Sequence, residues 1–208
     1  YIMNGGEDAS STFAASAKFN DVANGYWAAN SIGYCATKEI VAGAGNNLYY
    51  PNNDVTGVQL AKMALVALGY DPTIEKLTAW AINTINLAED AGLFDDMNKD
   101  FNASAAASRQ EAAQILYNML LSEMVCYTDN GTNIIIGDIT INTQGEYSDV
   151  TNGTSSDGNI EDDGLMQFAE RYFDDLQKAP GEADDFGRPS NIWTLKSDEI
   201  GTYADDPE

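Results

Sequence analysis

The sequence predicts a mainly α-helical protein: tandem helix–loop–helix repeats followed by a small mixed α/β C-terminal portion. From residue 18 to about 125, apolar residues recur at the three- and four-residue spacing of amphipathic helices. Within that region two stretches correspond to each other at a nearly constant offset, which indicates an internal repeat. After residue 127 the chain becomes rich in β-branched residues and in turn-forming Gly, Ser and Asn. We expect five segments: a flexible N-terminal segment at 1–17, repeats at 18–75 and 76–127, a β-hairpin and linker at 128–160, and a helix plus extended segment at 161–208.

Each repeat is expected to contain two helices separated by an irregular loop. The helical spacing places these four helices at residues 27–38, 56–68, 78–91 and 108–124. Gly69 and Gly92 directly follow the second and third, where glycine commonly ends a helix.

The internal repeat is defined by matched positions in the two units. Trp27, Ile40 and Val41 correspond to Trp80, Leu93 and Phe94 at an offset of 53 residues. Thr56, Gln59, Ala61, Met63 and Leu68 correspond to Ser108, Glu111, Ala113, Ile115 and Leu120 at an offset of 52. One deleted loop residue explains the change of offset, so the pattern predicts a duplicated unit.

The second helix of each unit begins with the same capping pattern. Thr56 is followed three residues later by Gln59, and Ser108 is followed three residues later by Glu111. In such a capping box the hydroxyl accepts from the third helical N–H, and the longer side chain accepts from the backbone of the cap. Both helices are therefore expected to start at these residues.

The C-terminal portion is predicted from shorter signals. Residues 133–141 favour a strand or hairpin, either folded on itself or available as an edge strand to a neighbouring subunit. Residues 144–158 have the composition of a linker. An amphipathic helix is expected from Asp162 or Asp163 through Leu176. A turn at 187–189 then separates it from two short extended runs, 192–195 and 199–203.

The charge balance excludes several classes of partner. Ten Lys and Arg stand against 33 Asp and Glu, giving a net charge of −23. Nucleic-acid affinity depends on cationic side chains at phosphates, so we expect no nucleic-acid partner. No stretch approaches the roughly 20 apolar residues that a membrane span needs, so no membrane insertion is expected. Divalent cations, neutral glycans and other proteins remain open as partners.

The residue inventory also argues against catalysis. The chain has no His, the commonest general base and metal ligand, and it shows no nucleophile motif or phosphate-binding loop. We therefore expect a protein that is not an enzyme. Its two cysteines, Cys35 and Cys126, either form one disulfide in an oxidising compartment or remain buried thiols.

The first unit resembles the S-layer homology family of bacterial surface proteins. The resemblance begins with Phe19-Asn20-Asp21-Val22 and Tyr26-Trp27, and it continues through residues 38–43, 49–51 and 55–70 in the family's order. In the second unit, Ser108-Arg109-Gln110-Glu111 stands at the family's T-R-A-E signature. The resemblance covers residues 18 to about 125.

The resemblance implies an extracellular location at the cell wall and attachment to secondary cell-wall polysaccharide, often pyruvylated. It implies glycan-binding roles for Arg109, Trp27, Trp80 and Asp21. Gly57 stands where the first unit should carry the signature Arg. Other roles remain open: the tryptophans as the first core residue of each helix, Asp21 as the cap of a turn, and Arg109 as an exposed residue with an acidic partner.

A calcium site is a further possibility in the predicted linker. Asp157, Asn159, Glu161 and Asp162 supply the oxygen ligands that Ca²⁺ prefers, without the full twelve-residue loop pattern. The alternative is a solvated linker that leads into a helix.

Three functional hypotheses follow. The first is a structural protein that forms or tethers a surface layer or filament, with copies of itself as partners. The second is an anchor that binds cell-wall polysaccharide. The third makes this chain the accessory part of a larger secreted enzyme or adhesin.

Overall fold

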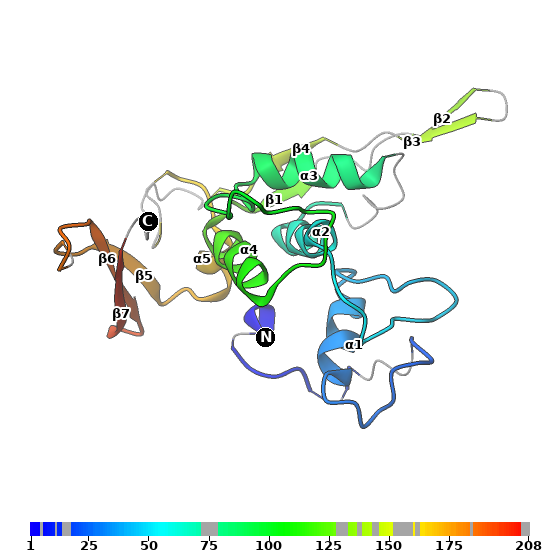
Figure 1. Ribbon diagram of the computed structural model, residues 1–208, viewed down its shortest axis with the longest axis horizontal. Helices are drawn as coiled ribbons and strands as arrows, with labels where there is room; N and C mark the ends of the chain where they lie inside the picture. The colour runs from blue at the N-terminus through cyan, green and yellow to red at the C-terminus, as the bar shows by residue number, and fades with distance from the viewer. Residues whose placement is uncertain are drawn as a thin grey trace.

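The computed structural model describes residues 1–4, 6–10, 12–13, 18–71, 79–127, 133–136, 139–142, 146–151, 160, 163–183 and 185–204. Within those ranges the chain forms five α-helices, one 3₁₀-helix and seven short strands. A body of helices carries a three-stranded sheet at one end and a projecting hairpin at the other (Figure 1). The fold is therefore mixed α/β rather than mainly α, because the C-terminal third contains more strand than the sequence predicts.

The helical body contains α1 (Ala29–Thr37), α2 (Gly57–Leu68), α3 (Trp80–Asp90) and α4 (Arg109–Leu121). All four predicted helices are present, although α1 and α3 begin two residues later than expected and α4 ends three residues earlier. Helix α2 lies at the centre and contacts both α3 and α4.

Both predicted capping boxes are confirmed. Thr56 Oγ1 accepts from the backbone of Gln59 and Gln59 Oε1 accepts from the backbone of Thr56. Ser108 and Glu111 make the same pair of bonds at the start of α4. At the other end of α2, Gly69 has a φ of 111°, and a Cβ there would clash with the Val125 carbonyl oxygen, so glycine is required.

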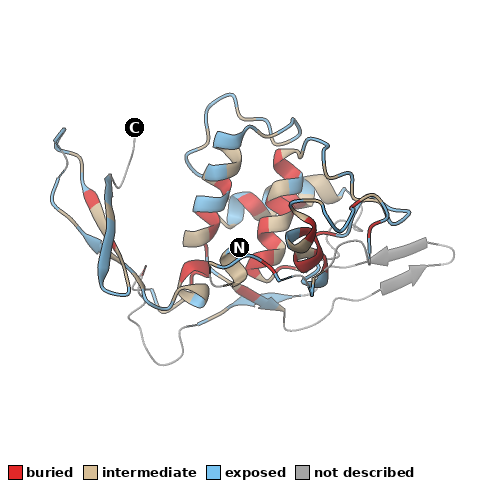
Figure 2. Ribbon diagram, turned by 90° about the horizontal axis from the view of Figure 1, so that it is seen from below, coloured by how far each residue is buried: buried red, intermediate tan, exposed pale blue. Residues whose placement is uncertain are grey.

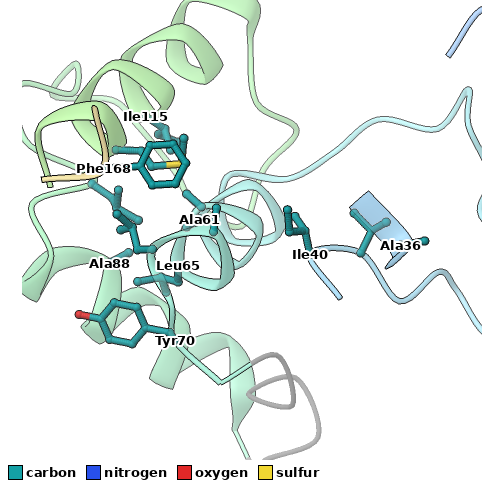
Figure 3. Close-up of a cluster of buried hydrophobic side chains, with 14 of the residues drawn as sticks. Ala36, Ile40, Ala61, Leu65, Tyr70, Ala88, Ile115 and Phe168 are labelled. Atoms are coloured by element: carbon teal, nitrogen blue, oxygen red, sulfur yellow. The ribbon is translucent and has the colours of Figure 1, made fainter. Parts of the chain in front are cut away.

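The core lies around α2. Leu65, Leu68 and Ala61 are completely buried, and side chains from α3, α4 and α5 pack with them (Figure 3). In Figure 2 the buried residues concentrate on the facing sides of the helices, while their outer faces are exposed. The offset-matched positions Ile40 and Leu93 are both buried in this core. The duplication of the whole unit remains a prediction.

The predicted helix from Asp162 or Asp163 to Leu176 is wrong over most of its length. Only α5 (Phe168–Tyr172) is helical, and the chain then enters β5 (Leu176–Pro180). β5 pairs antiparallel with β6 (Ser190–Leu195), which pairs with β7 (Asp198–Ala204). Leu176 pairs with β6, and at the other end of the predicted helix Leu165 and Gln167 form bridges to Thr151 and Glu123. These tertiary contacts outweigh the local helical pattern, because such contacts override weak helix propensity.

A second correction concerns the predicted linker. β4 (Tyr147–Asp149) pairs with β1 (Val125–Tyr127), so part of the expected linker is a strand packed beside the body. α4 ends at Leu121 because Ser122 already has extended backbone that leads towards β1. The Ser122 hydroxyl lies within hydrogen-bond distance of the carbonyl oxygens of Ala91 and Asn118, at 2.9 and 2.8 Å.

The predicted hairpin is confirmed as an internal pair of strands, β2 (Asn133–Ile136) with β3 (Ile139–Asn142). The N-terminal segment, predicted to be flexible, makes defined contacts in its described part. Its 3₁₀-helix η1 (Ile2–Asn4) contacts α5, and the Tyr34 hydroxyl donates to the Met3 carbonyl oxygen at 3.2 Å.

Candidate functional site

The motif Phe19–Val22 fixes a loop against the helical body. Phe19 and Val22 are buried in the core, and Asp21 between them accepts two backbone hydrogen bonds. Its Oδ1 accepts from Tyr49 N at 2.9 Å and its Oδ2 accepts from Tyr50 N at 2.7 Å. Asp21 therefore clamps residues 49–50, which lie almost thirty positions away, rather than capping the turn next to it.

The clamp also shifts the ionisation of the carboxyl group. Desolvation acts to raise the pKa of Asp21, but the backbone N–H groups of Tyr50, Tyr49 and Asp21 itself lower it below its ordinary value. The carboxylate is thus held in its charged, hydrogen-bond-accepting form.

The clamped loop forms one wall of an open groove of about 620 Å³. The opposite wall comes from α2 and from the first residue of α3. The groove is lined by Ile40, Val41, Ala42, Gly43, Ala44, Tyr49, Tyr50, Pro51, Asn53, Asp54, Val55, Gln59, Lys62, Met63 and Trp80. Three aromatic rings and one cation thus meet in a cavity of the size that holds small molecules or a few sugar rings.

Lys62 is the cation of this groove. It lies on α2, is only 5% exposed, and its Nζ donates to the Ile40 carbonyl oxygen at 3.4 Å. A buried ammonium group is held in place by such partners and is strongly favoured beside a negative ligand. Lys62, Tyr49 and Tyr50 were not predicted as binding residues; the run Tyr49-Tyr50-Pro51 was the available signal.

The two predicted tryptophans occupy different environments. Trp80 is half-buried and lines the groove, where it can contact a ligand. Trp27 is 88% exposed in the turn before α1, so it is not the first core residue of a helix. Its ring contacts that of Tyr26 at a tilt of 43°, with the ring centres 5.9 Å apart. The Tyr26 hydroxyl donates to the carbonyl of Pro51 at the groove, so Trp27 lies beside the groove rather than within it.

The comparisons with known proteins agree with this geometry. Residues 18–61, which contain the clamp and most of the groove, match the S-layer homology domain. Residues 18–61 are called the S-layer homology domain below, after the family model that they match. This match confirms the expected resemblance and the extracellular, cell-surface location.

Two relatives extend the similarity beyond the S-layer homology domain. The chain is 27% identical over 116 residues to the "Middle cell wall protein" of Brevibacillus brevis, covering 56% of this chain and 10% of that protein. It is 30% identical over 111 residues to a "Cell surface protein" of Thermoanaerobacter kivui, covering 53% of this chain and 14% of that protein. The chain thus spans a small fraction of these relatives. No solved structure matches.

The first capped helix of the S-layer homology domain has a blocked N-terminus. Val58 N donates to Ala103 O at 2.7 Å and Gly57 N donates to Ala105 O at 3.2 Å. The loop that supplies these carbonyls approaches so closely that a Cβ on Gly57 would lie 2.9 Å from Ala103 Cα. The N–H groups that could bind an anion are therefore already occupied by the chain itself.

Arg109 lies at the other capped helix. It is the first residue of α4, is exposed, and makes no ion pair within the described part of the chain. It does not line the groove that contains Lys62 and Trp80. The predicted glycan residues therefore divide into two places: Asp21, Trp80 and the neighbouring Trp27 at the groove, and Arg109 at α4.

The remaining predicted sites involve metals and cysteines. Asp157, Asn159, Glu161 and Asp162 lie outside the described residues. Among the described residues, no group of three or more Asp, Glu, Cys or His side chains could hold a metal ion. Cys35 and Cys126 are not joined: Cys35 is half-buried and Cys126 is exposed. None of the helices in the described part is long and apolar enough to span a membrane.

Proposed function

We propose that this chain is a non-catalytic cell-surface anchor that binds a cell-wall polysaccharide in the groove beside Asp21. One observation carries the proposal: a groove formed mostly by residues 18–61 places Tyr49 and Tyr50, together with Trp80 from α3, around the buried cation Lys62 of α2. Flat apolar faces with a few placed polar groups are the usual lining of a ligand site.

The charge distribution favours a glycan with an acidic substituent, such as a pyruvyl carboxylate. The net charge of −23 repels polyanions at long range, but salt screens that field beyond about 8–10 Å. Inside the groove the nearest fixed cation is Lys62, which can pair with one carboxylate of a largely neutral sugar chain. Arg109 supplies a second cationic contact on a longer glycan.

Co-sedimentation with isolated cell-wall sacculi tests this proposal. We expect Trp80→Ala and Lys62→Met to reduce binding about tenfold or more, because each removes a central contact. Phe186→Ala is the matched control, since Phe186 is 83% exposed in the C-terminal portion. If both groove variants sediment as well as the parent, the groove is not the binding site.

The two predicted glycan-binding residues that do not line the groove, Trp27 and Arg109, are tested in the same co-sedimentation assay. Trp27→Ala is expected to weaken binding less than Trp80→Ala, because Trp27 lies beside the groove. Arg109→Ala should weaken binding only to glycan chains long enough to reach α4. An unchanged affinity for intact sacculi would remove Arg109 from the site.

A second function, assembly into a surface layer or filament, is favoured by the hairpin β2–β3. This hairpin extends away from the helical body, where a neighbouring copy could pair with its edge (Figure 1). Negative-stain microscopy and sedimentation velocity of the parent and of a variant lacking residues 133–142 test it. A parent protein that stays monomeric at high concentration contradicts this function.

A further inference from the structure

A second cleft is lined by residues of α4 and of the three-stranded C-terminal sheet, outside residues 18–61. Figure 1 shows where these two elements lie in the fold. Its apolar part is a cavity of about 550 Å³. α4 contributes Tyr117 and Leu121, and the C-terminal portion contributes Leu176, Trp193, Ile200 and Tyr203. The sheet and the helix thus line an open cavity between them with mostly apolar side chains.

The rim of this cavity is unusually exposed for apolar residues. Tyr117 is 49% exposed, Ile200 is 53% exposed and Tyr203 is 59% exposed. Scattered exposed apolar residues are ordinary, but these three surround one cavity, and clustered exposure of this kind marks interaction sites.

An acidic cavity of about 470 Å³ adjoins the apolar one and shares Asp96, Tyr117 and Leu121 with it. The charged residues that line it are Asp90, Asp95, Asp96, Glu123, Asp149 and Lys178. Carboxylates outnumber the single cation five to one, so this half of the cleft carries a strong negative potential.

The ionisation of Glu123 reflects that potential. Burial raises the pKa of its carboxyl, and the neighbouring charges of Asp149 and Asp163 raise it further. A carboxylate in this position is stabilised when a cation approaches, so the local field favours a positively charged occupant.

We propose that this cleft binds a basic segment of a partner protein, with an apolar side chain in the cavity between Leu121 and Trp193 and Lys or Arg side chains over the acidic cavity. Charge complementarity selects this occupant. At this cleft a second copy of this chain, with its net charge of −23, would add no positive charge to offset the acidic cavity, and a purely apolar ligand would leave the carboxylates uncompensated.

Fluorescence anisotropy with a labelled peptide of alternating Leu and Lys tests the proposal on the full chain. Two matched peptides serve as controls: one with Glu in place of Lys, and one with Ser in place of Leu. We expect only the Leu–Lys peptide to bind measurably, with an affinity that falls as salt is added. No binding of this peptide at about 1 mM would overturn the proposal, because a Kd above that value corresponds to less than about 4 kcal/mol.

Variants locate the peptide on the protein. Ile200→Ser and Tyr203→Ser should each weaken binding about tenfold, and Asp96→Asn should reduce both the affinity and its salt dependence. The controls are Phe186→Ser for an exposed aromatic residue and Glu7→Gln for an exposed carboxylate.

Each other outcome counts against the proposal. Equal binding of the Ser–Lys peptide would mean non-specific charge attraction, and equal binding of the Leu–Glu peptide would mean a purely apolar site. Self-association that the Ile200→Ser variant abolishes would assign the cleft to a second copy. Sedimentation with sacculi should be unchanged in all of these variants, which separates this cleft from the glycan groove.

Discussion

Replacing Gly57 by alanine should destabilise the protein, although alanine is the better helix former. Gly57 is the first residue of α2, and the loop before α4 crosses directly over it. A Cβ at this position would lie 2.9 Å from Ala103 Cα and 3.0 Å from Phe101 Cζ. Backbone atoms at that distance must move, because real Cβ contacts are longer.

The size of this destabilisation follows from two unfavourable contributions and one favourable one. Overpacking a closed contact costs about 1–3 kcal/mol, and weakening the bonds from Gly57 N and Val58 N costs about 1 kcal/mol more. The helix propensity of alanine returns up to about 1 kcal/mol. We expect a net loss of about 2 kcal/mol in the free energy of unfolding. For a chain of this length that loss lowers Tm by roughly 4–8 °C.

Thermal and urea unfolding followed by circular dichroism measure this loss. Gly25→Ala is the matched control, because no atom lies within 4 Å of a Cβ placed there and its stability should be unchanged. Gly57→Arg restores the residue that the family resemblance implies, and it should be less stable than Gly57→Ala without gaining affinity for sacculi. A Gly57→Ala protein as stable as the parent would refute the close contact between the loop and α2.

Two further predictions concern the caps and the clamp. Ser108→Ala and Thr56→Ala each remove a hydroxyl cap and should each lower the free energy of unfolding by about 1 kcal/mol, measured in urea; a loss at only one position would contradict the equivalence of the two caps. The lowered pKa of Asp21 means that its carboxylate stabilises the fold above the ordinary Asp range near pH 4, and that this contribution is lost as pH falls through the lower folded pKa. Asp21→Asn should therefore be less stable than the parent at neutral pH, and the difference in the free energy of unfolding between the two proteins should shrink as the pH falls. A difference that does not depend on pH would argue against the clamp.

The helical half of the fold could be predicted because its signals are local. Capping boxes, helix-ending glycines and three- to four-residue apolar spacing act between residues that are close in sequence. Distant contacts therefore change their effect little, and they predict the observed helices. Thr56, Gly69 and Ser108 all have the expected roles. The C-terminal portion was predicted less well because residues 165–176 have helical spacing, yet contacts with distant segments override it at both ends. Leu165 and Gln167 form bridges to Thr151 and Glu123, and Leu176 pairs with Leu195.

The candidate site was only partly predictable for a related reason. Asp21 and Trp80, which were predicted to bind glycan, both lie at the groove, although their binding role stays a prediction. The bonds from Tyr49 and Tyr50 to Asp21 could not be predicted, because these residues are distant in sequence. Lys62 appears in sequence as one polar position on an amphipathic helix. Only the packed structure shows that it is buried beside aromatic rings and Ile40.

The two capped helices show how similar sequence signals can acquire different functions. Both begin with a capping box, so both have N–H groups that could receive an anion. At α2 the loop at Ala103 occupies those groups, and only glycine fits beneath it. At α4, Ser108, Arg109 and Gln110 are all exposed, so a long cationic side chain is accommodated there without a clash. The close approach of Ala103 and Phe101 explains why position 57 requires glycine and leaves no room for an arginine there. The binding proposal therefore assigns cationic contacts to Lys62 in the groove and to Arg109 at α4, and none to the start of α2.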